Sequence, residues 1–190
     1  MAIALDVTDE TSIVAAARQI ENREGLLDVL INNAGVLYRV PALETDAANM
    51  LATYDVNVFG TVRTIRAFLP LLQRSPHPRI VNITSTSASM TLTSDPATPF
   101  GQSDTIVAYA SPKAAVTTIS LQYANAFRRD PSHSHIKINA ATPGHIATDL
   151  NGHAGTRMVK QGAKIVVDLA TLPDSGPSGG YFNEDGPLPW

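Results

Sequence analysis

The chain has 190 residues, of which 44% are hydrophobic and 16% charged, and its net charge is -3. This composition is that of one soluble globular domain, and the slight acidic excess argues against a nucleic-acid partner or an anionic membrane surface. The sequence contains no cysteine, which excludes disulfides, thiolate metal sites and cysteine nucleophiles.

Neither a targeting segment nor a membrane span is expected from the sequence. The first residues carry acidic rather than basic side chains, and no apolar run approaches membrane-spanning length. We therefore expect a cytoplasmic protein. The pair His133 and His135 lacks a third ligand nearby, so no metal site is expected.

Short apolar segments that suit buried strands alternate with longer segments of helical period, which is typical of a parallel sheet covered by helices. The first half of the chain predicts the end of a strand over 2–5, a helix capped by Thr8 and ended by Gly25, a strand over 28–32, and a long helical stretch over 45–72. Asn57 and Gly60 interrupt that stretch, and Pro70 marks its expected end. The fold class is therefore α/β.

The second half continues the same alternation. It predicts a strand over 79–84, helices over 108–129 and 156–172, a strand over 136–140 and a short last strand over 179–182. The segment from Ser87 to Val107 is long for a loop between a strand and a helix. Loops of this length are commonly functional, although a tolerated surface insertion is the alternative.

Several polar motifs occur at the ends of these elements in a fixed order. Tyr109 and Lys113 stand four residues apart on a helix, which places both side chains on one face. Alone, the pair is equally explained as part of an amphipathic surface. It gains weight because Asn32-Asn33-Ala34-Gly35 closes one strand, Ser85 ends the next, and Pro143-Gly144 follows a third.

This ordered set resembles the short-chain dehydrogenase/reductase family, over about the last two thirds of the family's chain. The long spacing between Ser85 and Tyr109 is similar to that of the carbonyl-reductase branch. The resemblance implies a Rossmann-like, doubly wound parallel sheet that is N-terminally truncated. Residues 1–190 would then form a single partial NAD(P)-binding domain that also carries the catalytic residues.

The resemblance also implies catalytic roles for four residues. Tyr109 would be the acid/base that exchanges a proton with the substrate oxygen, and Ser85 would hold that oxygen. A phenol with a pKa of about 10 needs a nearby cation, which Lys113 would supply while also donating to the nicotinamide ribose. Asn57 would anchor a water that links Lys113 to solvent; a polar residue that merely distorts the helix is the alternative.

Cofactor contacts are assigned through the same resemblance. The implied cofactor residues are Asp6, Val7, Asn33, Ala34, Gly35, Tyr109, Lys113, Pro143, Gly144, Ile146 and Thr148. Asn33-Ala34-Gly35 is equally a plain strand-to-loop turn, and Asp6 equally a carboxylate at the approach to a helix. The resemblance to carbonyl reductases favours NADP(H) over NAD(H). Tyr181 and Trp190 are candidate substrate-side aromatics, with core packing and a loose tail as the alternative.

The chain departs from the family in lacking a glycine-rich turn that would meet the cofactor pyrophosphate. In the family's sheet another strand lies beside the segment 28–32, so we expect here an exposed apolar edge, weak dinucleotide binding and self-association. Two interpretations remain. The chain is an NAD(P)H-dependent oxidoreductase that interconverts a small-molecule carbonyl and an alcohol, or it is an inactive truncated remnant or a non-catalytic binding protein. The substrate, and whether the chain is a monomer or a homo-oligomer, stay open.

Overall fold

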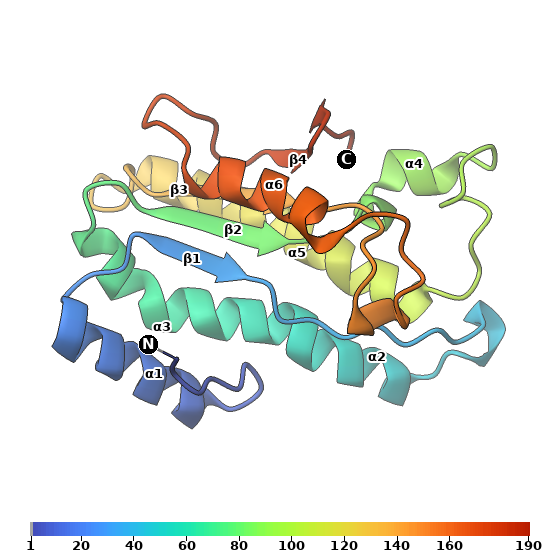
Figure 1. Cartoon of the computed structure of the whole chain (residues 1–190), viewed down its shortest axis with the longest axis horizontal. Coiled ribbons are helices and arrows are strands. Elements are labelled where there is room, and N and C mark those ends of the chain that lie inside the picture. The colour runs from blue at the N-terminus through green and yellow to red at the C-terminus, as the bar shows by residue number, and fades with distance from the viewer. Residues whose placement is uncertain (1) are drawn as a thin grey trace.

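One sheet organises the chain in the computed structural model, which describes residues 2–190 (Figure 1). Its strands lie in the order β1-β2-β3-β4-β5, parallel from β1 to β4, with β5 antiparallel to β4. The strands are β1 Val29–Asn32, β2 Arg79–Ile83, β3 Lys137–Ala141, β4 Tyr181–Asn183 and β5 Gly186–Pro187. Because β1 to β4 are parallel, their carboxyl ends share one edge of the sheet, where loops from distant parts of the chain meet.

Helices cover both faces of this sheet. The main helices are α1 Glu10–Glu24, α3 Gly60–Arg74, α5 Val107–Arg129 and α6 Val159–Ala170. One core cluster joins α1, α3 and α5 to Ile80 and Ile138, whereas a second joins α6 to Val81 and Ala141. Successive strand residues thus point to opposite faces, as in a sheet buried on both sides. Figure 1 shows α6 and α5 on opposite sides of β2. The predicted α/β, doubly wound class is confirmed.

The long helical stretch is continuous but contains an irregular turn. Helix α2, Ala47–Tyr54, passes into a π-helical turn over Asp55–Phe59 and then into α3. This turn contains Asn57, so the predicted interruption is present as a widened turn rather than a break. Pro70 lies inside α3 and not at its end, because Leu71 and Leu72 after it are buried in the core and hold the last turn in place.

Two predictions at the N-terminal end were wrong. Residues 2–6 form no strand, since no neighbouring strand lies there to pair with their backbone, although Ile3 packs against the core. The first helix is capped by Asp9, whose side chain accepts a hydrogen bond from the Thr11 amide at 2.9 Å. Thr8 does not serve as the cap because its hydroxyl donates to Asp6. The predicted end at Gly25 is confirmed, with a φ of 76°.

The long segment after β2 is more ordered than the sequence predicts. It contains a 3-10 turn over Thr86–Ala88 and a short helix, α4 Met90–Ser94. The far end of the chain lies against α4, because the Trp190 carbonyl oxygen accepts hydrogen bonds from the Thr91 amide and hydroxyl at 2.9 and 2.6 Å (Figure 1). This contact joins residues about a hundred positions apart, so no local pattern announces it.

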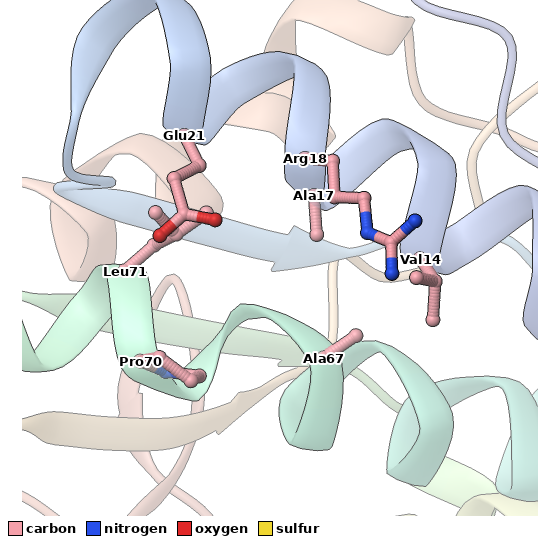
Figure 2. A pocket seen from close by; sticks show the side chains of 7 residues that line it. All are labelled: Val14, Ala17, Arg18, Glu21, Ala67, Pro70 and Leu71. Atoms are coloured by element: carbon pink, nitrogen blue, oxygen red, sulfur yellow. The ribbon is translucent and has the colours of Figure 1, made fainter.

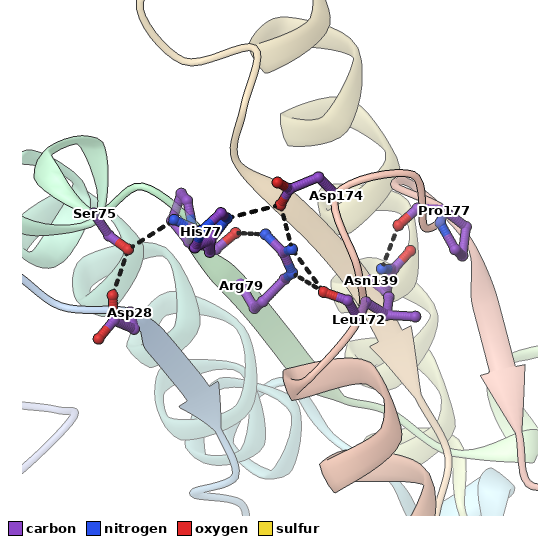
Figure 3. A network of polar contacts seen from close by, with 9 residues as sticks. Asp28, Ser75, His77, Arg79, Asn139, Leu172, Asp174 and Pro177 are labelled. Carbon is purple, nitrogen blue, oxygen red and sulfur yellow. Dashed lines mark hydrogen bonds and ion pairs between the residues drawn. The ribbon is translucent and has the colours of Figure 1, made fainter.

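The amino-terminal edge of the sheet is held by a buried arginine (Figure 3). The Arg79 side chain is 4% exposed and donates to the Leu172 carbonyl oxygen at 2.9 and 2.6 Å. Its guanidinium also pairs with Asp174 at 2.8 Å, and Asp174 contacts His77. A buried guanidinium is tolerated because its donors are satisfied in this way. The network therefore ties the start of β2 to the segment between α6 and β4.

No helix in the part of the chain that the structure describes is both long and apolar enough to cross a membrane. Within residues 2–190, no three His, Asp or Glu side chains are grouped so that they would hold a metal ion.

Candidate active site

The candidate catalytic residues converge at the carboxyl edge of the sheet. Ser85 follows β2 directly, Gly35 lies in the loop after β1, and Tyr109 and Lys113 lie in the first half of α5. Asn57 reaches the same place from the π-helical turn. In an open parallel sheet this edge is where ligands bind. The structure thus brings together residues from positions 35 to 113 that are far apart in the sequence.

Lys113 is the buried cation of this group. Its ammonium lies 5.8 Å from the centre of the Tyr109 ring and donates to the Ile83 carbonyl oxygen at 2.8 Å. The residue is only 4% exposed. Burial lowers the Lys113 pKa to about 8, because an ammonium loses hydration there. An ammonium has several N–H donors, and the described residues give this one a single hydrogen-bond acceptor, so donors remain for a ligand.

Tyr109 is a half-buried phenol with one polar neighbour and one distant charge. Burial raises the Tyr109 pKa above its usual value, while the nearby Ser85 side chain and the charge of Arg39 act in the opposite direction. The net direction is upward, so the phenol carries its proton at neutral pH. It is therefore suited to donate a proton rather than to remove one.

Ser85 begins the 3-10 turn and is held by its neighbours. Its hydroxyl lies 2.9 Å from the Ser87 hydroxyl and accepts from the Ser87 amide at 3.3 Å. Its carbonyl oxygen accepts from the Ala88 amide at 2.9 Å and from the Tyr181 hydroxyl at 2.6 Å. Both ends of the residue are thus fixed beside the Tyr109 phenol.

The Asn57 side chain positions the loop after β1. Its amide oxygen accepts from the Val36 amide at 2.8 Å, and its nitrogen donates to the Val36 carbonyl oxygen at 3.0 Å. The backbone carbonyl oxygen of Asn57 accepts a hydrogen bond from the Thr61 hydroxyl. The side chain therefore holds the loop after β1 in place.

Gly35 lies directly over this polar group. A Cβ atom at Gly35 would stand 3.2 Å from the Asn57 amide oxygen and 3.5 Å from the Lys113 nitrogen. A larger side chain would cover the ammonium. The neighbouring Asn33 and Ala34 are exposed. The absence of a side chain at position 35 therefore avoids close contacts with the Asn57 amide oxygen and the Lys113 ammonium.

The other assigned cofactor residues lie in two further segments. Pro143 and Gly144 follow β3, and Gly144 has a φ of 81°. Ile146 bridges to Arg157, which pairs with Glu184, and Thr148 precedes a 3-10 turn over Asp149–Asn151. These residues thus lie beyond the carboxyl ends of the strands, as Ser85 does. Their segment is held by the bridge between Ile146 and Arg157.

Asp6 and Val7 lie at the approach to α1. The exposed Asp6 carboxylate accepts from the Thr8 amide and hydroxyl at 2.8 and 2.7 Å, which lowers the Asp6 pKa. Val7 packs on Gly60, where a Cβ atom would stand 2.9 Å from it. Asp6 thus shapes the turn before the helix, and Val7 lies beside the π-helical turn.

Sequence reasoning missed two contributors to this site. Arg39 acts on Tyr109 because the next residue, Val40, bridges to Ile106 just before α5. The sequence indicates Tyr181 only as an aromatic ring on the substrate side, whereas in the structure its hydroxyl donates to the Ser85 carbonyl oxygen. Each depends on a long-range contact, and neither lies in a recognisable motif.

Two hollows in the surface lie away from these residues. One separates α1 from α3 and is lined by Val14, Arg18, Glu21 and Pro70 among others (Figure 2). The other lies beside the starts of β1 and β2, near His77 and Asp174. Neither includes Ser85, Tyr109 or Lys113, so the chemistry is located by the polar side chains and not by these hollows.

The buried ammonium has a consequence for stability that does not depend on any ligand. The Lys113 pKa is about 8 in the folded chain against an ordinary 10.5, so the unfolded chain holds the proton more tightly between these values. The contribution of Lys113 to the free energy of unfolding should therefore rise as the pH goes from 8 to 10.5, by about 3 kcal/mol over the full window.

Lys113→Met should lack this rise, because it keeps the side-chain length and removes the titrating group. Urea unfolding of both proteins at several pH values checks the difference, with Lys164→Met on the exposed surface of α6 as the control. Parallel pH dependences for the wild type and Lys113→Met would contradict a depressed Lys113 pKa.

Known proteins resemble the chain over most of its length. Residues 1–159 match the short chain dehydrogenase family. (-)-Isopiperitenone reductase of Mentha piperita is 30% identical over 95% of this chain and 78% of the reductase. Carbonyl reductase [NADPH] 1 of Rattus norvegicus is 28% identical, over 98% of this chain and 78% of the rat protein.

A solved structure shows the same arrangement of elements. An NADPH-bound carbonyl reductase from chicken fatty liver superposes with a TM-score of 0.82 at 26% identity, over 99% of this chain and 76% of that chain. The family match and the parallel sheet with helices on both faces agree with this likeness. The chain is a member of the short chain dehydrogenases, an oxidoreductase family of which it resembles the carbonyl reductases.

Proposed function

We propose that the chain is an NADPH-dependent oxidoreductase that interconverts a small-molecule carbonyl, namely a ketone, aldehyde or quinone, with the corresponding alcohol. The observation that carries the proposal is the meeting of Ser85, Tyr109 and the buried Lys113 at the carboxyl edge of the sheet. A buried ammonium with unused donors is costly to keep, which favours a functional role over an accidental surface pair.

The residues present fit the nicotinamide-ribose end of the cofactor. Lys113 has N–H donors left for ribose hydroxyls, and Gly35 places no side chain over the ammonium. When bound, NADPH supplies the hydride. Pro143, Gly144, Ile146 and Thr148 would face the nicotinamide, Asn33 and Ala34 the adenosine ribose, and Asp6 and Val7 the adenine. The NADPH named for the rat and chicken reductases supports NADP(H) over NAD(H).

The proposed mechanism follows from the states of the side chains. The Ser85 hydroxyl holds the substrate oxygen beside Tyr109 and stabilises charge as it develops there. The Tyr109 phenol, protonated at neutral pH because burial raises its pKa, gives its proton to that oxygen. The Lys113 charge stabilises the phenolate that is left, and this stabilisation grows as the transfer proceeds.

Since the phenol begins protonated, reduction should be faster than oxidation at neutral pH. Steady-state NADPH oxidation with an activated aldehyde such as 4-nitrobenzaldehyde, over a range of NADPH concentrations, tests the proposal. Reduction that saturates with both reactants is the expected result. Absence of turnover at millimolar NADPH would leave the second candidate function, a remnant or binding protein without the chemistry.

Two observations favour the second candidate, a remnant or binding protein without the chemistry. The sequence has no glycine-rich turn to meet the pyrophosphate, and β1 pairs on one side only among the described residues, with Ile31 43% exposed. We therefore propose that the chain as given binds NADPH more weakly than micromolar and self-associates through β1. Calorimetric titration with NADPH and light scattering over a range of protein concentrations test this, and a monodisperse monomer with micromolar affinity would contradict it.

A further inference from the structure

Tyr181 contacts the backbone of the proposed substrate-holding residue. It lies at the start of β4, is 2% exposed, and its hydroxyl donates to the Ser85 carbonyl oxygen at 2.6 Å. Burial raises the Tyr181 pKa, so the hydroxyl stays a donor throughout the working pH range. This hydrogen bond joins the last part of the chain to the residue that follows β2.

The carbonyl that receives this hydrogen bond also anchors the turn after Ser85. The same oxygen accepts from the Ala88 amide at 2.9 Å, which closes the 3-10 turn over Thr86–Ala88. The Ser85 hydroxyl contacts Ser87 inside that turn. Movement of the Ser85 carbonyl would therefore shift both the turn and the hydroxyl that faces Tyr109.

A second set of contacts joins residues 181–190 to α4, the helix that follows the 3-10 turn. The rings of Tyr181 and Trp190 lie 5.9 Å apart, and the Trp190 carbonyl oxygen holds the Thr91 amide and hydroxyl at the start of α4. The Tyr181 carbonyl oxygen accepts from Leu188, which keeps β4 and the tail together. Residues 181–190 thus contact the segment from 85 to 94 at Ser85 and at Thr91.

We propose that Tyr181 is a positioning residue, whose hydroxyl holds the Ser85 backbone so that the Ser85 hydroxyl meets the substrate oxygen beside Tyr109. This inference rests on the proposed function for the role of Ser85. Tyr181 contacts neither Tyr109 nor Lys113. Its hydroxyl donates to the Ser85 carbonyl oxygen and also lies close to the Thr84 side chain.

The test compares Tyr181→Phe with Tyr123→Phe. Tyr181→Phe removes the hydroxyl and keeps the ring against Trp190, while Tyr123→Phe deletes a hydroxyl on α5 that makes no recorded hydrogen bond. Tyr181→Phe should lower kcat for carbonyl reduction about fivefold, the effect of one ordinary hydrogen bond, and leave the KM for NADPH unchanged. Amide hydrogen exchange in residues 86–91 should also become faster, whereas Tyr123→Phe should alter neither quantity.

The exchange measurement separates this inference from the proposed function. Unchanged exchange at 86–91, or a wild-type kcat, in Tyr181→Phe would overturn the positioning role. A loss of NADPH affinity equal to the loss of kcat would also overturn it, because that result indicates general damage. Failure of the proposed function would instead appear as carbonyl reduction that is equally fast in the wild type and in Tyr109→Phe.

Discussion

Tyr109→Phe should reduce kcat for NADPH-dependent carbonyl reduction by about 10²–10⁴-fold, the usual contribution of a positioned proton donor. The substitution removes the phenolic oxygen and keeps the ring beside Lys113, so NADPH binding should change little. Single-turnover and steady-state rates measure the loss, and NADPH titration by fluorescence measures the affinity.

The control for Tyr109→Phe is Tyr123→Phe, which removes a hydroxyl from the same helix away from the site. It should keep wild-type kcat and KM values. If Tyr109→Phe retained most of its activity while both variants remained folded, Tyr109 would not be the proton donor, and the mechanism proposed for the site would be wrong.

Lys113→Met should affect both binding and rate. Loss of charged hydrogen bonds to the ribose should weaken NADPH binding by about 10- to 100-fold, since hydrogen bonds to charged groups contribute about 1.5–3 kcal/mol each. The rate should fall as well, because the phenolate left by proton transfer loses the neighbouring charge. Measurement of kcat and of the dissociation constant for NADPH separates the two effects.

Lys164→Met serves as the matched control, because Lys164 pairs with Asp168 on the exposed face of α6. It should leave both quantities unchanged. An unchanged dissociation constant in Lys113→Met would contradict the ribose contact, and an unchanged rate would contradict the electrostatic support of Tyr109.

The sequence predicted the elements whose patterns are local and repeated. The strands β2 and β3 are short, mostly apolar segments buried on both faces, and α5 keeps one helical period over its whole length. All three were therefore found within a residue or two. The strand expected over 2–5 was wrong because an apolar pattern forms a strand only where another strand pairs with it. Likewise, the stretch was expected to fray from Pro70 and end near Leu72, but α3 runs to Arg74 because core packing of Leu72 outweighs the lost backbone hydrogen bond.

The candidate site was predicted in its membership but not in its internal contacts. The order of the motifs indicated that Ser85, Tyr109 and Lys113 belong together, and the structure places them at one edge of the sheet. The contacts of Asn57 with Val36, and of Tyr181 with Ser85, join residues 21 and 96 positions apart. Such pairings follow from the way the loops fold over the sheet, which no local sequence pattern records.

The central claim is that this chain transfers hydride from NADPH to a carbonyl carbon while Tyr109 donates the proton to the oxygen. Its most direct test is incubation of the protein with 4-nitrobenzaldehyde and NADPH deuterated at the transferable C4 position, followed by mass spectrometry of the alcohol. The account predicts one deuterium in the alcohol formed by the wild type and, in the same time, at least about 100-fold less alcohol with Tyr109→Phe. Undeuterated alcohol from the wild type, or equal deuterated alcohol from Tyr109→Phe, would contradict it.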